Sequence, residues 1–172
     1  MKLIQSLIVT ACVFTLSARG ESNVKISEVH LCCKSCITGV EKAVGTVDGA
    51  KAEVDQAAGT VTITGPDTAT VQKGATALLK AGYFGKSSDP AIKMNSRTGA
   101  KGTQVKNLKV EGVHLCCGKC VKAVDHAMKT VSGVKEHTAT KGAESFDVTG
   151  DFSDKEVFTA LQKEGLTGKV GK

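Results

Sequence analysis

The chain has 172 residues, a formal net charge of +6, 41% hydrophobic residues and only 3% aromatic residues. This length leaves room for one ordinary domain or two small ones, whose cores must be mainly aliphatic. The positive charge is spread along the chain without a basic stripe, and side chains that could stack on bases are scarce, which argues against nucleic-acid binding.

Residues 1–20 have the pattern of a signal peptide. Lys2 gives a positive start, residues 3–16 are mostly apolar but too few to span a bilayer, and Ala18-Arg19-Gly20 offers a small-x-small cleavage site. We therefore expect an exported protein, periplasmic or secreted, without a membrane span. An alternative is that Cys12 is a lipidated first residue after a lipobox-like stretch, although the apolar run continues past it.

An internal repeat organises the rest of the chain. When Lys25–Lys51 is aligned with Lys109–Lys135, 13 of the 27 paired positions are identical. The repeat predicts two similar domains at residues 22–86 and 105–172. Residues 87–104 between them are rich in Ser, Gly, Lys and Asn and lack hydrophobic periodicity. We therefore expect a flexible linker, with two domains that fold independently and can reorient.

The first copy alternates strand and helix patterns. Val24 and Ile26 alternate with polar residues as on a half-buried strand, and residues 34–46 place apolar side chains three and four apart as on a helix. The following patterns predict strands at 50–55 and 60–65, a helix at 68–81 capped by Asp67, and a last short strand at 83–86. This βαββαβ order is the ferredoxin-like arrangement, an α+β fold.

The second copy repeats these patterns. Its strands are expected at 106–112, 134–139, 144–150 and 167–170, and its helices at 119–130 and 153–164. Ser153 and Glu156 have the spacing of a capping box at the start of the second helix.

Six of the seven cysteines lie in two clusters of the form Cys-Cys-x-x-Cys, one in each copy, at Cys32, Cys33, Cys36, Cys116, Cys117 and Cys120. Such clusters close only very small loops, so they fit ligand sets better than the disulfides of a secreted domain. Each cluster falls where the first helix of its copy is expected to begin. The free N–H groups and the positive dipole end of a helix stabilise a thiolate, which is the form that binds metal.

A CxxC loop between strand and helix, in two βαββαβ copies, resembles the heavy-metal-associated domain family. That family includes copper chaperones, N-terminal modules of metal-transporting ATPases and periplasmic mercury-binding proteins, with the pattern Gly-Met-x-Cys-x-x-Cys. The resemblance implies metal ligands at Cys33 and Cys36 and at Cys117 and Cys120. It also implies a protein that is not an enzyme and that exchanges a soft metal ion with a transporter or acceptor protein.

Both copies depart from the family pattern in the same way. Leucine replaces the methionine, and an additional cysteine and a histidine precede each CxxC, at Leu31, Cys32 and His30 and at Leu115, Cys116 and His114. Four ligands per copy would also suit Zn²⁺ or Cd²⁺, whereas copper(I) needs only two or three sulfurs. We expect about one ion per copy, Cu(I) or Zn(II), with the CxxC pairs dominating the affinity and the preceding cysteines tuning it.

Two other functions compete with metal binding. A CxxC pair also serves thiol–disulfide oxidoreductases, but the element order differs from that of thioredoxin. Only Pro66 and Pro90 are present, so the cis-proline that such enzymes use near the motif has no candidate. The second competitor is a protein-interaction module whose cysteines form structural disulfides. The sequence leaves open which metal binds and whether the two sites act alone or share an ion.

Overall fold

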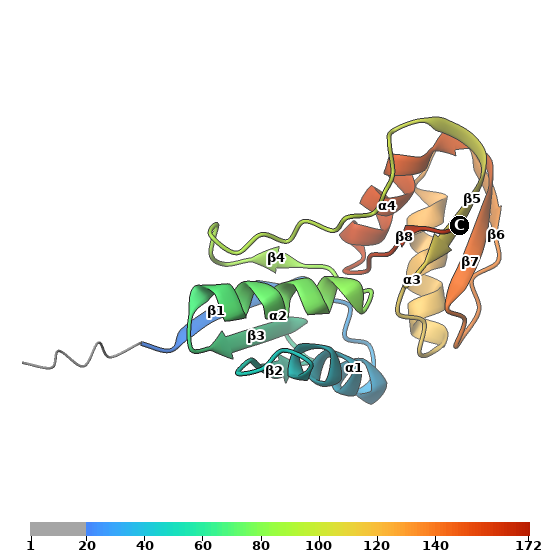
Figure 1. Cartoon of the computed structure of the whole chain (residues 1–172). Helices are drawn as coiled ribbons and strands as arrows, with labels where there is room; N and C mark the ends of the chain where they lie inside the picture. The colour runs from blue at the N-terminus through green and yellow to red at the C-terminus, as the bar shows by residue number, and fades with distance from the viewer. Residues whose placement is uncertain (1–19) are drawn as a thin grey trace, which may run out of the picture.

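The computed structural model describes residues 20–172, so the predicted signal peptide and Cys12 lie outside the described residues. In this range the chain forms four helices and two four-stranded antiparallel sheets, with the two halves packed side by side (Figure 1).

Both halves follow the predicted βαββαβ order. The first half contains β1 (Ser22–Ser27), α1 (Lys34–Gly45), β2 (Lys51–Asp55), β3 (Thr60–Gly65), α2 (Thr68–Lys80) and β4 (Lys86–Ser87). The second half contains β5 (Gln104–Glu111), α3 (Gly118–Lys129), β6 (Val134–His137), β7 (Ser145–Ser153), α4 (Asp154–Lys163) and β8 (Lys169–Val170). The sheet orders are β2-β3-β1-β4 and β6-β7-β5-β8, so equivalent strands occupy equivalent places.

Apolar periodicity decides which face of each element is buried. In α1 the buried residues are Cys36, Val40 and Val44, which are spaced four apart and therefore lie on one face of the helix. In β1, Val24 and Ile26 are buried and alternate with exposed neighbours. The same face of α1 that packs on the core therefore also carries the second cysteine of the CxxC motif.

The two predicted helix caps have different outcomes. Asp67 caps α2 as predicted, and its carboxylate accepts a hydrogen bond from the N–H of Thr70 at 2.7 Å. The predicted capping box of Ser153 and Glu156 is wrong, because the Ser153 side chain caps no N–H group in the described part of the chain. Ser153 does occupy the N-cap position of α4, but it is also the last residue of β7, which runs longer than expected and pairs with β5 up to this residue.

Residues 87–104 differ from the predicted flexible linker, because they contact both halves. The Gln72 side chain on α2 accepts from the N–H of Lys93 at 2.7 Å and donates to its carbonyl at 3.0 Å. Gln162 on α4 donates to the Ser96 hydroxyl at 2.6 Å, and Ile92 is buried. Low hydrophobic periodicity gave no sign of these contacts, since most of them are made by the linker's backbone and polar side chains.

The carboxylate of Asp154 holds the C-terminal end of the linker in place. Asp154, the first residue of α4, accepts hydrogen bonds from the N–H groups of Lys101, Gly102 and Thr103 at 2.9, 2.7 and 3.0 Å. Burial of the carboxyl acts to raise its pKa, but the three N–H donors outweigh burial and lower the pKa overall. The ionised Asp154 therefore attaches the linker to the second half.

The two halves contact each other through a reciprocal backbone pairing. The Phe84 N–H donates to the Gly165 carbonyl at 3.0 Å, and the Thr167 N–H donates to the Gly82 carbonyl at 2.9 Å. These residues are equivalent in the repeat, so each half presents the same turn to the other. The contact has the geometry of a two-fold interface between identical subunits. The halves are docked in this structure, and their reorientation in solution stays a prediction.

Glycine is required at the centre of this contact. Gly82 has φ +88°, and a Cβ there would lie 2.4 Å from the Gly112 carbonyl oxygen of the other half. Gly165 has φ +72°, and its Cβ would lie 2.5 Å from the backbone nitrogen of His30. Both the left-handed backbone and the close approach of the two halves therefore exclude side chains at these positions.

We predict that Gly82→Ala loosens the interface between the halves. An L residue in the left-handed region costs roughly 1–2 kcal/mol, and the added methyl group also collides with the opposite backbone. Gly142→Ala is the matched control, because Gly142 has φ +80° and open space around its Cβ position. Denaturant unfolding should show a larger loss for Gly82→Ala, and the amide of Thr167 should exchange faster with solvent only in that variant. Equal losses and unchanged exchange would contradict this account.

We also predict that Asp154→Asn destabilises the protein by about 1–3 kcal/mol, because an amide cannot accept all three N–H bonds without bringing its own donor against them. The folded-state pKa of Asp154 is lowered, so its contribution is present above the unfolded pKa of about 4 and is lost as the pH falls through the folded pKa. Denaturant unfolding of both proteins from pH 7 to pH 3 should therefore show the difference shrinking in acid. Asp151→Asn, at an exposed position, should have little effect at any pH.

Candidate metal centre

Each Cys-Cys-x-x-Cys loop lies between the first strand and the first helix of its half. Cys33 and Cys117 occupy the N-cap positions of α1 and α3 with extended backbone, at φ −160° and −151°. Cys36 and Cys120 lie in the first helical turn and are fully buried. Each helix start therefore presents two thiols, one at its cap and one on its core-facing side.

The two loops face each other across the interface, and the six sulfurs form one cluster. The Sγ of Cys32 lies 3.3 Å from that of Cys117 and 3.5 Å from that of Cys120. The reciprocal contacts join Cys116 to Cys33 at 3.4 Å and to Cys36 at 3.5 Å. The sequence predicted a site in each copy, and it is the docking of the halves that brings these two sites together.

Two groups of four cysteines have sulfurs close enough to hold a metal ion. One group is Cys32, Cys33, Cys36 and Cys116, and the other is Cys32, Cys116, Cys117 and Cys120. In each group all four sulfurs lie within 4.8 Å of one another. All six predicted cysteine ligands are thus part of a potential metal centre, and each group draws on both halves.

The two histidines predicted as ligands lie beside the cluster and belong to neither four-sulfur group. The imidazole of His114 stacks on the ring of Tyr83, with centroids 4.6 Å apart. The Nε2 atoms of His30 and His114 are buried without a hydrogen-bond partner among residues 20–172. Burial lowers the pKa of His30, which favours the neutral imidazole. Metal ligation by these histidines stays a prediction.

Tyr83 covers the cysteine cluster on the side where the two halves meet. It is completely buried, and its hydroxyl donates to the Cys36 carbonyl at 3.1 Å. Burial, together with the nearby Cys36 thiolate, raises the pKa of Tyr83, so the phenol stays neutral. Gly39 makes room for this hydroxyl, since a Cβ at Gly39 would lie within van der Waals overlap of it. In the sequence, the signal for this role was the position of Tyr83 at the start of the expected last strand, which the βαββαβ order brings toward the cysteine loop.

The thiols differ in how readily they ionise. Hydrogen bonding from Cys120 lowers the pKa of Cys36 to about 2, and the same shared proton raises that of Cys120. The backbone N–H of Cys120 lowers the pKa of Cys117 to about 6, as expected at a helix N-terminus. Burial raises the pKa of Cys32 to about 12 and also raises that of Cys116. Without metal, the cluster therefore holds thiolates and thiols together at neutral pH.

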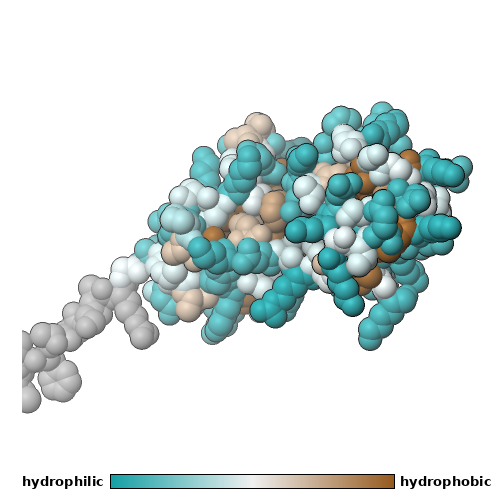
Figure 2. Space-filling view, turned by 90° about the horizontal axis from the view of Figure 1, so that it is seen from above, coloured by the Kyte–Doolittle hydropathy of each residue, from teal (hydrophilic) through white to brown (hydrophobic). Residues whose placement is uncertain are grey.

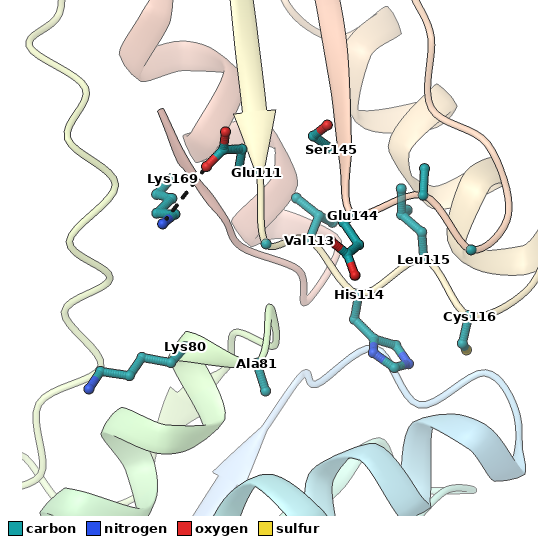
Figure 3. A pocket seen from close by; sticks show the side chains of 13 residues that line it. Lys80, Ala81, Glu111, Val113, His114, Leu115, Cys116, Glu144, Ser145 and Lys169 are labelled. Atoms are coloured by element: carbon teal, nitrogen blue, oxygen red, sulfur yellow. Dashed lines mark ion pairs between the residues drawn. The ribbon is translucent and has the colours of Figure 1, made fainter. Parts of the chain in front are cut away.

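A cavity of about 690 Å³ opens beside the cluster. Figure 3 shows Cys116 and His114 at its edge, with the His114 ring directed toward the first half, and the Lys169–Glu111 ion pair farther along its wall. On the face of the molecule seen from above, hydrophilic side chains predominate, with smaller apolar patches between them (Figure 2). The cavity gives solvent and small solutes a route to the Cys116 side of the cluster.

No family model and no curated protein matches the chain. Among solved structures, the N-terminal soluble domains of Bacillus subtilis CopA are 16% identical with a TM-score of 0.33, covering 89% of this chain and 95% of that one. The first two RRM domains of the yeast poly(U)-binding protein Pub1 are 11% identical with a TM-score of 0.25, covering 87% of this chain and 98% of theirs. Similarities this low define neither a family nor a function.

Among residues 20–172, none of the helices has the length and apolar character needed to cross a membrane.

We predict that Cys117 and Cys32 react very differently with iodoacetamide in the reduced, metal-free protein. Only the thiolate reacts, so labelling of Cys117 should rise with pH to half its maximum near pH 6, while Cys32 stays a thiol at pH 7. Peptide mass spectrometry of samples labelled between pH 5 and pH 8 measures both rates. Added Cd²⁺ should suppress labelling of Cys117, and equal labelling of Cys117 with and without the ion would show that its sulfur is not a ligand.

Proposed function

We propose that the protein binds soft metal ions outside the cytoplasm through its cysteine cluster and passes them to an acceptor. The observation that carries this proposal is the convergence of six cysteine sulfurs into two four-sulfur groups. Thiolates select soft or borderline ions such as Cu(I), Zn²⁺ and Cd²⁺ over hard ions, so the ligand set itself defines the class of metal. The two ferredoxin-like halves and their CxxC helix starts support a distant relation to the heavy-metal-associated domains.

Transfer of the ion is supported by the accessibility of the cluster. Cys32, Cys33, Cys116 and Cys117 are half-buried, unlike the fully buried Cys36 and Cys120. A thiol of an acceptor protein, such as a metal transporter, can therefore reach the ion and replace one ligand at a time. The support for transfer is therefore the partial exposure of four of the six cysteines.

The competing function is thiol–disulfide exchange, which the short distances between sulfurs of opposite halves would favour in an oxidising compartment. An exchange enzyme needs one exposed attacking thiolate and a resolving partner. Six converging sulfurs exceed that need, whereas they supply two complete metal coordination shells if two sulfurs are shared. This difference favours metal binding without catalysis.

We expect the reduced chain lacking residues 1–20 to bind about two soft metal ions. Native mass spectrometry under anaerobic, reducing conditions, after incubation with Zn²⁺, Cd²⁺ or Cu(I), measures the ion and its stoichiometry together. A variant with all six cluster cysteines replaced by serine is the control and should bind none. Failure of the reduced wild-type protein to retain any of these ions would refute the proposed function, and retention by the serine variant would place the site elsewhere.

A further inference from the structure

The two four-sulfur groups overlap in two residues. Cys32 and Cys116 belong to both groups, whereas Cys33 and Cys36 belong only to the first and Cys117 and Cys120 only to the second. Two tetrahedral ions have eight coordination positions between them, and six sulfurs fill all eight if two sulfurs bridge. Cys32 and Cys116, which are common to both groups, provide the two bridging sulfurs that this count requires.

The sulfur–sulfur distances fit this arrangement. A zinc–sulfur bond of about 2.3 Å gives a tetrahedron whose sulfurs are about 3.8 Å apart. Eight sulfur–sulfur contacts of 3.3 to 3.9 Å each join two members of the same four-sulfur group. These contacts account for eight of the eleven edges of two tetrahedra that share the Cys32–Cys116 edge, and the four sulfurs of each group all lie within 4.8 Å of one another.

The position of Cys32 distinguishes shared sites from separate ones. If each half held its own ion, the Sγ of Cys32 would belong with the CxxC pair of its own loop. It lies 3.6 Å from Cys36 in its own half, but 3.3 Å from Cys117 and 3.5 Å from Cys120 in the other half. Cys116 is 3.6 Å from Cys120 of its own half and 3.4 Å from Cys33 of the other. Each of these two sulfurs is thus placed between both CxxC pairs.

The electrostatic surroundings suit a negatively charged cluster. Six thiolates and two divalent ions leave a net charge of about −2. The N-termini of α1 and α3 both point at the sulfurs, and neither first turn contains an acidic residue. Lys34 and Lys119 lie in these first turns instead. Lysine is unfavourable at a helix N-terminus by itself, but it compensates an anion bound there.

We propose that the protein holds two divalent, tetrahedral ions of the zinc and cadmium class in one six-sulfur cluster, with Cys32 and Cys116 as bridging ligands. This inference rests on the proposed function and specifies its site. Cys33 and Cys36 complete the shell of one ion, and Cys117 and Cys120 complete the shell of the other. Binding displaces the protons that remain on the thiols, and all six sulfurs then act as thiolates.

The test is NMR of the spin-active cadmium isotope bound to the reduced chain lacking residues 1–20. Two bound ions should give two resonances in the region of four-sulfur coordination, and each should be split by the other through the bridging sulfurs. Cys32→Ser should move both resonances away from that region, because both ions lose a sulfur. Cys36→Ser is the matched control and should move or abolish only one. Circular dichroism checks folding, and Cys116→Ser should reproduce the effect of Cys32→Ser from the other half.

The outcomes separate this inference from the proposed function. Two unsplit resonances, of which Cys32→Ser moves only one, would overturn the bridges while leaving soft-metal binding intact. A single cadmium ion per chain, or four copper(I) ions with no stable cadmium complex, would overturn the pair of divalent ions in the same way. Absence of any bound soft metal would overturn both. If the bridges are correct, removing Cys32 disturbs more of the centre than removing Cys36, which reverses the order of importance expected from the sequence.

Discussion

The reciprocal backbone hydrogen bonds between the turns at residues 82–84 and 165–167 are the interaction on which the cysteine cluster depends. Each turn lies against the residues that lead into the opposite cysteine loop, since Gly82 approaches the backbone of Gly112 and His114, and Gly165 approaches that of Glu28 and His30. The pairing therefore fixes both loops at once. Without it, each half would present three sulfurs, which is fewer than a tetrahedral ion requires.

The contact between the halves also compensates for the small hydrophobic core of each half. A domain of roughly 65 residues buries a modest share of its surface and is marginally stable alone, and this chain has few aromatic side chains to enlarge its cores. Here the buried apolar residues of both halves form one continuous cluster, in which Tyr83 and Leu166 meet at the interface. Docking thus extends a small aliphatic core across the boundary between the halves, so stability and assembly of the centre have a common origin.

Features with local causes could be predicted from the sequence. The helices and strands follow from apolar periodicity, the cap at Asp67 from its side-chain chemistry, and the six cysteines from their repeated spacing. Features that depend on tertiary contacts could not be predicted from the sequence. Ser153 is the N-cap residue of α4, but it also ends β7, and its side chain does not make the predicted cap hydrogen bond. Likewise, Gly82 and Gly165 are typical of any helix end. Their second role, which is to let the backbones of the two halves approach closely, is visible only where the two turns meet.

The near two-fold symmetry of the interface has an evolutionary consequence. A single copy with this turn and this cysteine loop could pair with a second copy and bring the same six sulfurs together, because the backbone pairing and the shortest sulfur contacts across the interface join equivalent residues. Such a dimer would dissociate on dilution. Joining the copies in one polypeptide replaces that dependence on protein concentration with a fixed local concentration set by the linker. Gene duplication would also free each copy to change alone, and the difference between Tyr83 and Leu166 is a change of that kind.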